Sequence, residues 1–170
     1  MGLFDKKKNQ QNYIDLVRKT AEEALPEVSG WDMTLTTLES GALATLKKTT
    51  AYSLKYAGLN MTARLVGLRV RTSENPFAKT TFITCFKGSE IYFLSIGDGM
   101  SKTNFEIDPD TCIHFTTAEI EGMKTGMGKK VTLILREGGK FTFQYGVGAG
   151  TIYSLPDGDK KLEQFVKSFT

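Results

Sequence analysis

The second half of the chain is a succession of short apolar segments separated by turn residues. This pattern restricts the fold more than any other feature of the sequence. Residues 80–86 and 90–96 are rich in β-branched and aromatic side chains, and the Lys-Gly-Ser sequence between them is typical of a hairpin loop. Residues 130–136 and 141–145 alternate apolar and polar side chains on either side of a Gly-Gly pair. The pattern predicts a mainly β (α+β) domain of antiparallel hairpins.

Less regular segments predict additional strands. Residues 102–107 and 111–116 flank an Asp-Pro-Asp turn signal. Residues 52–56 alternate, and residues 61–71 alternate with a change of phase near Gly67 that a β-bulge would produce. A helix is the alternative over this last segment, because its apolar residues also have helical spacing.

The last predicted element is an amphipathic helix over residues 158–169. Asp157 is suited to cap its start, and Ser154 is the alternative cap. Four large apolar side chains fall on one helical stripe, namely Leu162, Phe165, Val166 and Phe169. A helix of this length is marginal alone in water, so we expect the stripe to be buried against the β-domain.

Residues 9–25 predict an N-terminal helix that Pro26 ends. Its apolar stripe is narrow and rich in alanine, so we expect it to pack weakly or against a partner: Tyr13, Leu16, Val17, Thr20, Ala21 and Ala24. We therefore divide the chain into an N-terminal helix with a hinge, residues 1–30, and a β-domain with the C-terminal helix, residues 31–170. Removal of residues 1–25 is expected to leave a folded domain.

These elements follow one another in an order that is similar to a known series. The series comprises one hairpin, a short strand, a second hairpin and a closing helix, at residues 82–94, 101–107, 130–143 and around Leu162 and Phe165. It resembles the bacterial pleckstrin-homology-like (PH-like) domains, a branch of the superfamily that also holds GRAM domains, over roughly residues 61–170. The resemblance implies a partly open β-barrel or orthogonal sandwich capped by the C-terminal helix, with the N-terminal helix appended. The chain departs from the family in having no Trp in the closing helix, since Trp31 lies far upstream.

Charge and cysteine use bear on location. The net charge is +3, and the segment from Lys47 to Lys87 holds eight cations and one anion, Glu74. This segment is either a solvated strand face or an anion-facing surface. Cys85 and Cys112 lie in apolar strand patterns, as expected of reduced thiols, and a disulfide between them is the alternative. With no signal peptide or spanning segment apparent, we expect a cytoplasmic protein, with peripheral attachment to the inner face of the membrane as the alternative.

The residues that could support chemistry do not form a recognisable set. His114, Cys85 and Cys112 supply at most three ligands, whereas a structural zinc site uses about four. We expect His114 to be a strand residue with a local hydrogen bond, and Asp108 and Asp110 to shape a turn. Two glycine-rich segments lack the spacing of phosphate-binding loops and are expected to be loops, at residues 122–130 and 146–151. The sequence therefore predicts no catalytic residue, no metal site and no cofactor.

Three arginines carry the one specific site hypothesis. Arg64, Arg69 and Arg71 resemble the basic cluster with which some pleckstrin-homology domains bind phosphoinositides. On a strand, Arg69 and Arg71 would lie on one face about 7 Å apart, and Arg64 would join them only through the bulge near Gly67. Solvent-facing arginines are the alternative.

The combined pattern predicts a non-catalytic module that binds a protein or peptide. A membrane-surface module is the alternative, in which Lys6–Lys8 and the arginine cluster would bind anionic lipid headgroups. A small hydrolase is the second alternative. No nucleic-acid partner is predicted.

Overall fold

The computed structural model describes residues 2–38, 55–56, 59–60, 81–96, 107, 113–136 and 139–169. Within them, helix α1 (Leu3–Ala24) and the 3-10 helix η1 (Pro26–Val28) precede the sheet, and helix α4 (Pro156–Lys167) follows it. The main strands are β1 (Asp32–Leu38), β4 (Thr81–Lys87), β5 (Glu90–Ser95), β6 (Ile113–Phe115), β7 (Ile120–Gly126), β8 (Lys130–Leu135) and β9 (Lys140–Gln144). Two short strands, β2 (Lys55–Tyr56) and β3 (Leu59–Asn60), pair with each other.

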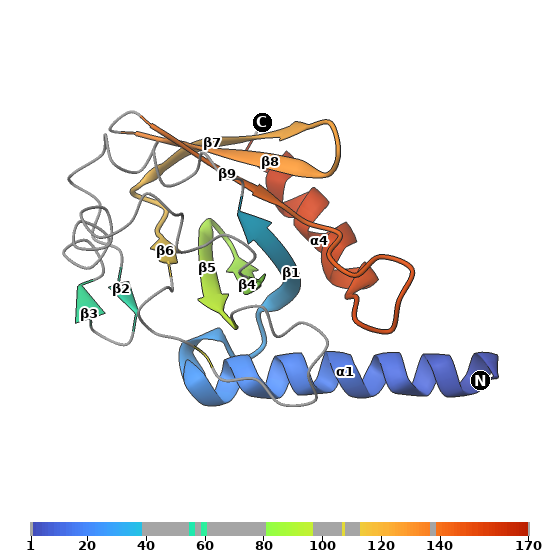
Figure 1. Ribbon diagram of the computed structural model, residues 1–170. Helices are drawn as coiled ribbons and strands as arrows, with labels where there is room; N and C mark the ends of the chain where they lie inside the picture. Colours follow the sequence, from blue (N-terminus) through green and yellow to red (C-terminus); the bar gives the residue numbers. More distant parts are fainter. Residues whose placement is uncertain are drawn as a thin grey trace, which may run out of the picture.

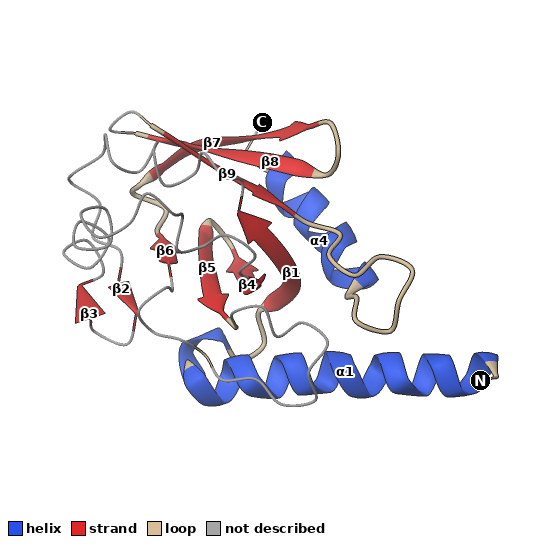
Figure 2. Ribbon diagram, viewed as in Figure 1, coloured by secondary structure: helices blue, strands red, loops and turns tan. Residues whose placement is uncertain are grey.

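The main strands form one open antiparallel sheet of seven strands in the order β6-β5-β4-β1-β9-β8-β7 (Figures 1 and 2). The hairpins predicted in the second half of the chain are confirmed as β4–β5 and β8–β9. The mainly β architecture with a helix near each end of the chain is therefore confirmed. The predicted strand over residues 102–107 lies outside the described residues except for Ile107, which is not in a strand, and residues 61–71 lie outside them entirely.

Two strands of the seven-stranded sheet occupy segments where we expected none, as does the short strand β3. The central strand β1 begins in a segment whose sequence is ambiguous, and β7 takes in Gly122 and Gly126 of a segment expected to be a loop. The expected loop at the second glycine-rich segment is confirmed as turns, with positive φ at Gly146, Gly148 and Gly150.

The sheet curls so that its concave face forms an aromatic core. The ring centroid of Phe93 on β5 lies 5.1 Å from that of Phe141 and 5.0 Å from that of Phe143, both on β9. In a flat sheet β5 and β9 would be about 14 Å apart, because β4 and β1 lie between them. The short ring distances therefore require strong curvature, which gives a partly open sandwich.

Helix α1 covers the opposite, convex face of the sheet. Strands β8 and β9 are buried on alternate residues, whereas β4 and β5 are buried at successive residues, so both of their faces are covered. Figure 1 shows α1 below β5, β4 and β1, with its axis running across the direction of these strands. Its Tyr13, Val17 and Ala21 are buried in the same core cluster as the strands. The helix thus packs closely on the sheet, contrary to the weak packing expected from its alanine-rich stripe.

The connection from α1 to β1 is short and ordered. The helix ends at Ala24, as Pro26 predicts, and the segment expected to be a hinge contains η1 with Val28 fully buried. The division of the chain at residue 30 stays a prediction. None of the helices in the described ranges is both long and apolar enough to cross a membrane.

Helix α4 packs against β1, β7 and β4. It begins at Pro156, whose fixed φ suits the first helical position, and its N-cap is Leu155 without a side-chain hydrogen bond. The predicted caps Asp157 and Ser154 are therefore wrong. Leu162 and Val166 are buried as expected, while Phe165 is half-buried with its ring 5.1 Å from that of Phe86.

Gly158 brings α4 into direct contact with the sheet. A Cβ atom at this position would lie 1.9 Å from the carbonyl oxygen of Met33 on β1, so only glycine allows the approach. The start of α4 is thereby fixed beside the start of β1.

Candidate binding cleft between α1, β1 and α4

A cavity of about 190 Å³ opens where the middle of α1 meets the starts of β1 and α4. Three apolar side chains that are buried or half-buried line it, namely Ile14, Met33 and Leu155. Five polar side chains complete the lining, namely Gln11, Arg18, Asp32, Asp157 and Lys161. We call this cavity the α1–β1–α4 cleft.

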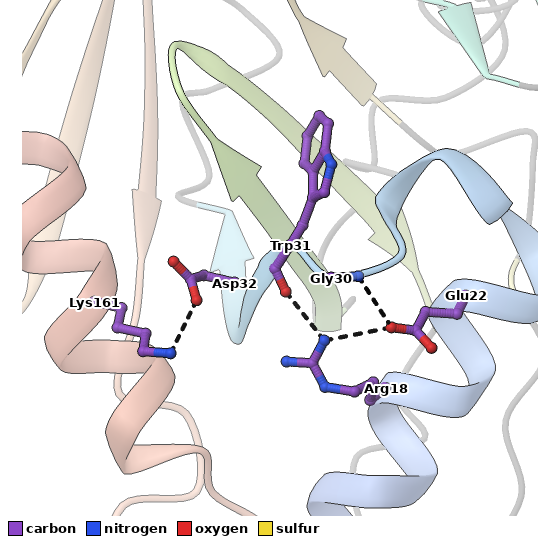
Figure 3. Close-up of polar contacts among 6 residues, drawn as sticks. All are labelled: Arg18, Glu22, Gly30, Trp31, Asp32 and Lys161. Atoms are coloured by element: carbon purple, nitrogen blue, oxygen red, sulfur yellow. Dashed lines mark hydrogen bonds and ion pairs between the residues drawn. The ribbon is translucent and has the colours of Figure 1, made fainter.

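An ion pair joins two walls of the cleft. The Nζ of Lys161 on α4 donates to Oδ1 of Asp32 on β1 at 3.0 Å (Figure 3). The two side chains are 56% and 44% exposed. Exposed pairs of this kind contribute about 0–1 kcal/mol, so a ligand can separate them at little cost.

The third wall is held by Arg18 on α1. Its guanidinium donates to the carbonyl oxygen of Trp31 at 3.1 Å and to Oε1 of Glu22 at 3.4 Å (Figure 3). The same carboxylate oxygen accepts from the backbone N–H of Gly30 at 3.4 Å. Gly30 has a φ of 77°, in the left-handed region that favours glycine. These contacts hold α1 against the entry to β1 and so fix the cleft's width.

The charges around the cleft are balanced. Two cations, Arg18 and Lys161, and two acids, Asp32 and Asp157, line it. The carboxylate partner within 4 Å is Asp32 for Lys161 and Glu22 for Arg18. Pockets for drug-sized ligands hold about 300–1,000 Å³, so this one has room for one or two side chains. An apolar floor with donors and acceptors at its rim suits a polypeptide segment, which carries both.

A second polar cluster lies towards the β6 edge of the sheet, where His114 on β6 stacks on Tyr92 of β5 with ring centroids 3.8 Å apart. Nε2 of His114 lies 3.3 Å from Oε2 of Glu90, and the Tyr92 hydroxyl donates to Glu27 at 3.1 Å. Burial lowers the pKa of His114, opposed by the Glu90 contact. The expected strand histidine with a local hydrogen bond is confirmed. The cluster ties β5, β6 and η1 together.

The sequence-predicted site residues fall mainly elsewhere. Arg64, Arg69 and Arg71 lie outside the described residues, as do Asp108, Asp110 and Cys112. Cys85 is buried on β4. In the part of the chain that the structure describes, no group of three or more His, Cys, Asp and Glu is placed to hold a metal ion.

Sequence reasoning missed the cleft because its walls are distant along the chain. Asp32 and Lys161 are 129 positions apart, and no local pattern links them. The glycine at position 158, the first residue of a predicted helix, was the available signal of close packing at this point.

Comparison with known proteins gives no relative. No family model matches the chain, and neither a curated protein nor a solved structure does. The function has to be inferred from the geometry of this chain.

Proposed function

We propose that this protein is a non-catalytic binding module that takes a protein or peptide segment into the α1–β1–α4 cleft. The observation that carries the proposal is the composition of the cleft, an apolar floor beneath a rim of balanced charges. A partner's apolar side chain would rest on Ile14, Met33 and Leu155. Polar groups of the partner beside that side chain would separate Lys161 from Asp32 and bind to each of them. This ion pair is exposed, so its separation costs little.

The charge balance favours a polypeptide over a lipid headgroup at this place. A phosphate could contact Lys161 only by displacing Asp32, and the two acids Asp32 and Asp157 would then lie beside the bound anion, whereas a polypeptide segment carries both donors and acceptors. The lipid-headgroup alternative based on Arg64, Arg69 and Arg71 stays a prediction about residues outside the described ranges. The small hydrolase stays the last alternative.

The PH-like family and a cytoplasmic location belong to the same proposal. The curled antiparallel sheet and the helix α4 packed against it support the family's architecture. The helix α1 on the convex face would be an addition to it. A buried Cys85 supports a reducing compartment.

Selection from a displayed library of random peptides tests the proposal. Peptides enriched on the full chain are measured by titration calorimetry against the wild type, Lys161→Glu and Lys160→Glu. Lys160 is the matched control, because it lies on the same helix, is exposed, and does not line the cleft.

We expect Lys161→Glu to weaken binding at least about tenfold, roughly 1.4 kcal/mol, and Lys160→Glu to leave it within about twofold. Failure to enrich any peptide, or equal losses in the two variants, would contradict binding in the cleft.

A further inference from the structure

One face of α1 continues beyond the α1–β1–α4 cleft. At about 100° per residue, five side chains fall within about 80° of the helix circumference, namely Phe4, Lys7, Gln11, Ile14 and Arg18. The last three line the cleft, whereas Phe4 and Lys7 lie nearer the start of the helix. We call these five residues the α1 stripe. The cleft therefore occupies only the second half of a longer face.

The first half of the α1 stripe is uncovered. Phe4 is 87% exposed and Lys7 is also exposed, and Figure 1 shows that the first turns of α1 extend beyond the strands. The sheet-packing side of the helix is a different one, since the buried Val17 lies about 100° from the middle of the stripe. A single exposed apolar side chain is ordinary on a protein surface. Phe4 differs because it continues the wall of a cleft at helical spacing.

The spacing within the α1 stripe is that of a contact between two helices. Successive members are three or four residues apart, as along the seam where two α-helices pack side by side. At about 1.5 Å per residue, the stripe is about 21 Å long. Its apolar members, Phe4 and Ile14, lie about 15 Å apart along the axis, and Lys7 lies about 4.5 Å from Phe4. The stripe thus offers a neighbour two apolar contacts with a cation between them.

We propose that the segment bound by the cleft is an amphipathic helix of another protein, packed along the α1 stripe. This inference rests on the proposed function and specifies the partner. One apolar side chain of the partner helix would enter the cleft beside Ile14, and a second would cover Phe4 about three turns away. The partner helix would therefore carry apolar residues about eleven positions apart, with an acidic residue about four positions from the one that covers Phe4.

The acidic residue is required by the charges along the face. Arg18 has Glu22 as its acid partner, and Lys161 has Asp32. Within the described ranges, no ion pair joins Lys7 to an acid. A carboxylate on the partner helix would supply the charge that Lys7 lacks.

A helical partner suits this face better than an extended one. The backbone groups of α1 are bonded within the helix, so α1 offers an extended segment no ladder of hydrogen bonds. A helix satisfies its own backbone groups and presents side chains at the three- and four-residue spacing of the stripe.

A second copy of α1 fits the stripe poorly. In an antiparallel pair centred on Gln11, Phe4 of one copy would lie opposite Arg18 of the other, and Lys7 would lie opposite Ile14. Each apolar side chain would then meet a cation. In a parallel pair the two Lys7 side chains would face each other. Neither arrangement places an acid against Lys7.

Peptide titration of the full chain tests the proposal. Peptides of about 20 residues, long enough to span the stripe as a helix, are selected on the wild type and titrated by calorimetry against Phe4→Ser and Lys7→Glu. The matched controls are Met127→Ser, an exposed apolar residue outside α1, and Lys19→Glu, an exposed lysine of α1 off the stripe. Each peptide is also made with its acidic residue replaced by lysine. Circular dichroism measures the helix gained on mixing, and thermal melts confirm that each variant folds.

We expect Phe4→Ser and Lys7→Glu each to weaken binding at least about fivefold, and both controls to stay within about twofold. The peptides should gain helix on binding, and the lysine-substituted peptide should bind Lys7→Glu at least about threefold more tightly than it binds the wild type. Binding that depends on Lys161 but is unchanged in Phe4→Ser would overturn this proposal and leave the proposed function intact. Bound peptides that gain no helix would do the same. A dimer of the free chain that Phe4→Ser dissociates would overturn it in favour of a second copy. Failure to select any peptide would contradict both proposals.

Discussion

Replacement of Val17 by alanine separates two descriptions of α1. Val17 is completely buried on the sheet-facing side of the helix. If α1 were an appended helix, alanine would raise its helix propensity by up to about 0.7 kcal/mol and leave the melting of the β-domain unchanged. Because Val17 is packed in the core, we expect the opposite sign.

The magnitude follows from the atoms removed. Loss of two buried carbon groups costs about 1.6 kcal/mol, and the cavity left behind adds about 1 kcal/mol, while the gain in helix propensity offsets part of this. The net expectation is a loss of about 2 kcal/mol in the free energy of unfolding. For a chain of this size that lowers the melting temperature by about 4–8 °C.

Urea denaturation and a thermal melt followed by circular dichroism measure the change. Lys19→Ala is the matched control on the same helix, because its side chain is 71% exposed, and it should change stability by less than about 0.5 kcal/mol. An unchanged or raised melting temperature for Val17→Ala would refute the packing of α1, and with it the third wall of the cleft.

The following predictions test further features of the fold. Removal of residues 2–24 should abolish a cooperative melt, because it exposes the convex face of β4 and β5; a truncated chain that melts cooperatively would contradict this and would support the predicted division at residue 30. Gly158→Ala should destabilise by about 1–3 kcal/mol in urea denaturation despite its better helix propensity, because the new Cβ meets the Met33 carbonyl; a stability equal to that of the Gln164→Ala control would disprove the contact. Because the pKa of His114 is lowered in the folded protein, protonation of this residue costs stability as the pH falls below about 6.5. His114→Phe should therefore flatten the dependence of melting temperature on pH between about 7.5 and 5.5, and an unchanged slope would contradict this role of His114. Burial raises the pKa of Asp159, so its ionisation costs stability as pH rises through that raised pKa; Asp159→Asn, which keeps the acceptor for Thr34 and Gly146, should be as stable as the wild type or more stable at pH about 7, and a marked loss would contradict this assignment.

The hairpins could be predicted because their information is local. In β8 and β9, apolar residues alternate along strands of five or six residues that a Gly-Gly pair separates. The central strand β1 was missed because its interior is polar. Thr34 and Thr36 are buried, and the Thr36 hydroxyl lies 2.7 Å from that of Thr84. Threonines on neighbouring strands can be buried because their hydroxyl groups form hydrogen bonds with each other across the sheet. A pattern of apolar residues along the sequence does not reveal such pairs.

The position of α1 had a signal that the sequence analysis did not use. In β4 and β5, apolar residues occupy successive positions, as in Phe82-Ile83 and Ile91–Leu94, and not only alternate ones. This indicates strands buried on both faces, so the convex face requires a cover. The cleft had no comparable signal. Arg18, Asp32 and Lys161 come from three elements, and only the curvature of the sheet and the close approach at Gly158 bring them together.

Binding in the α1–β1–α4 cleft is tested most directly by amide chemical-shift mapping of the full chain during titration with a selected peptide. We predict that the largest shifts occur at Ile14, Arg18, Met33 and Gly158, which line the cleft, and that the β7–β8 turn around Met127 shifts little. Largest shifts at the β7–β8 turn or around His114, with the cleft residues unchanged, would contradict the proposed function.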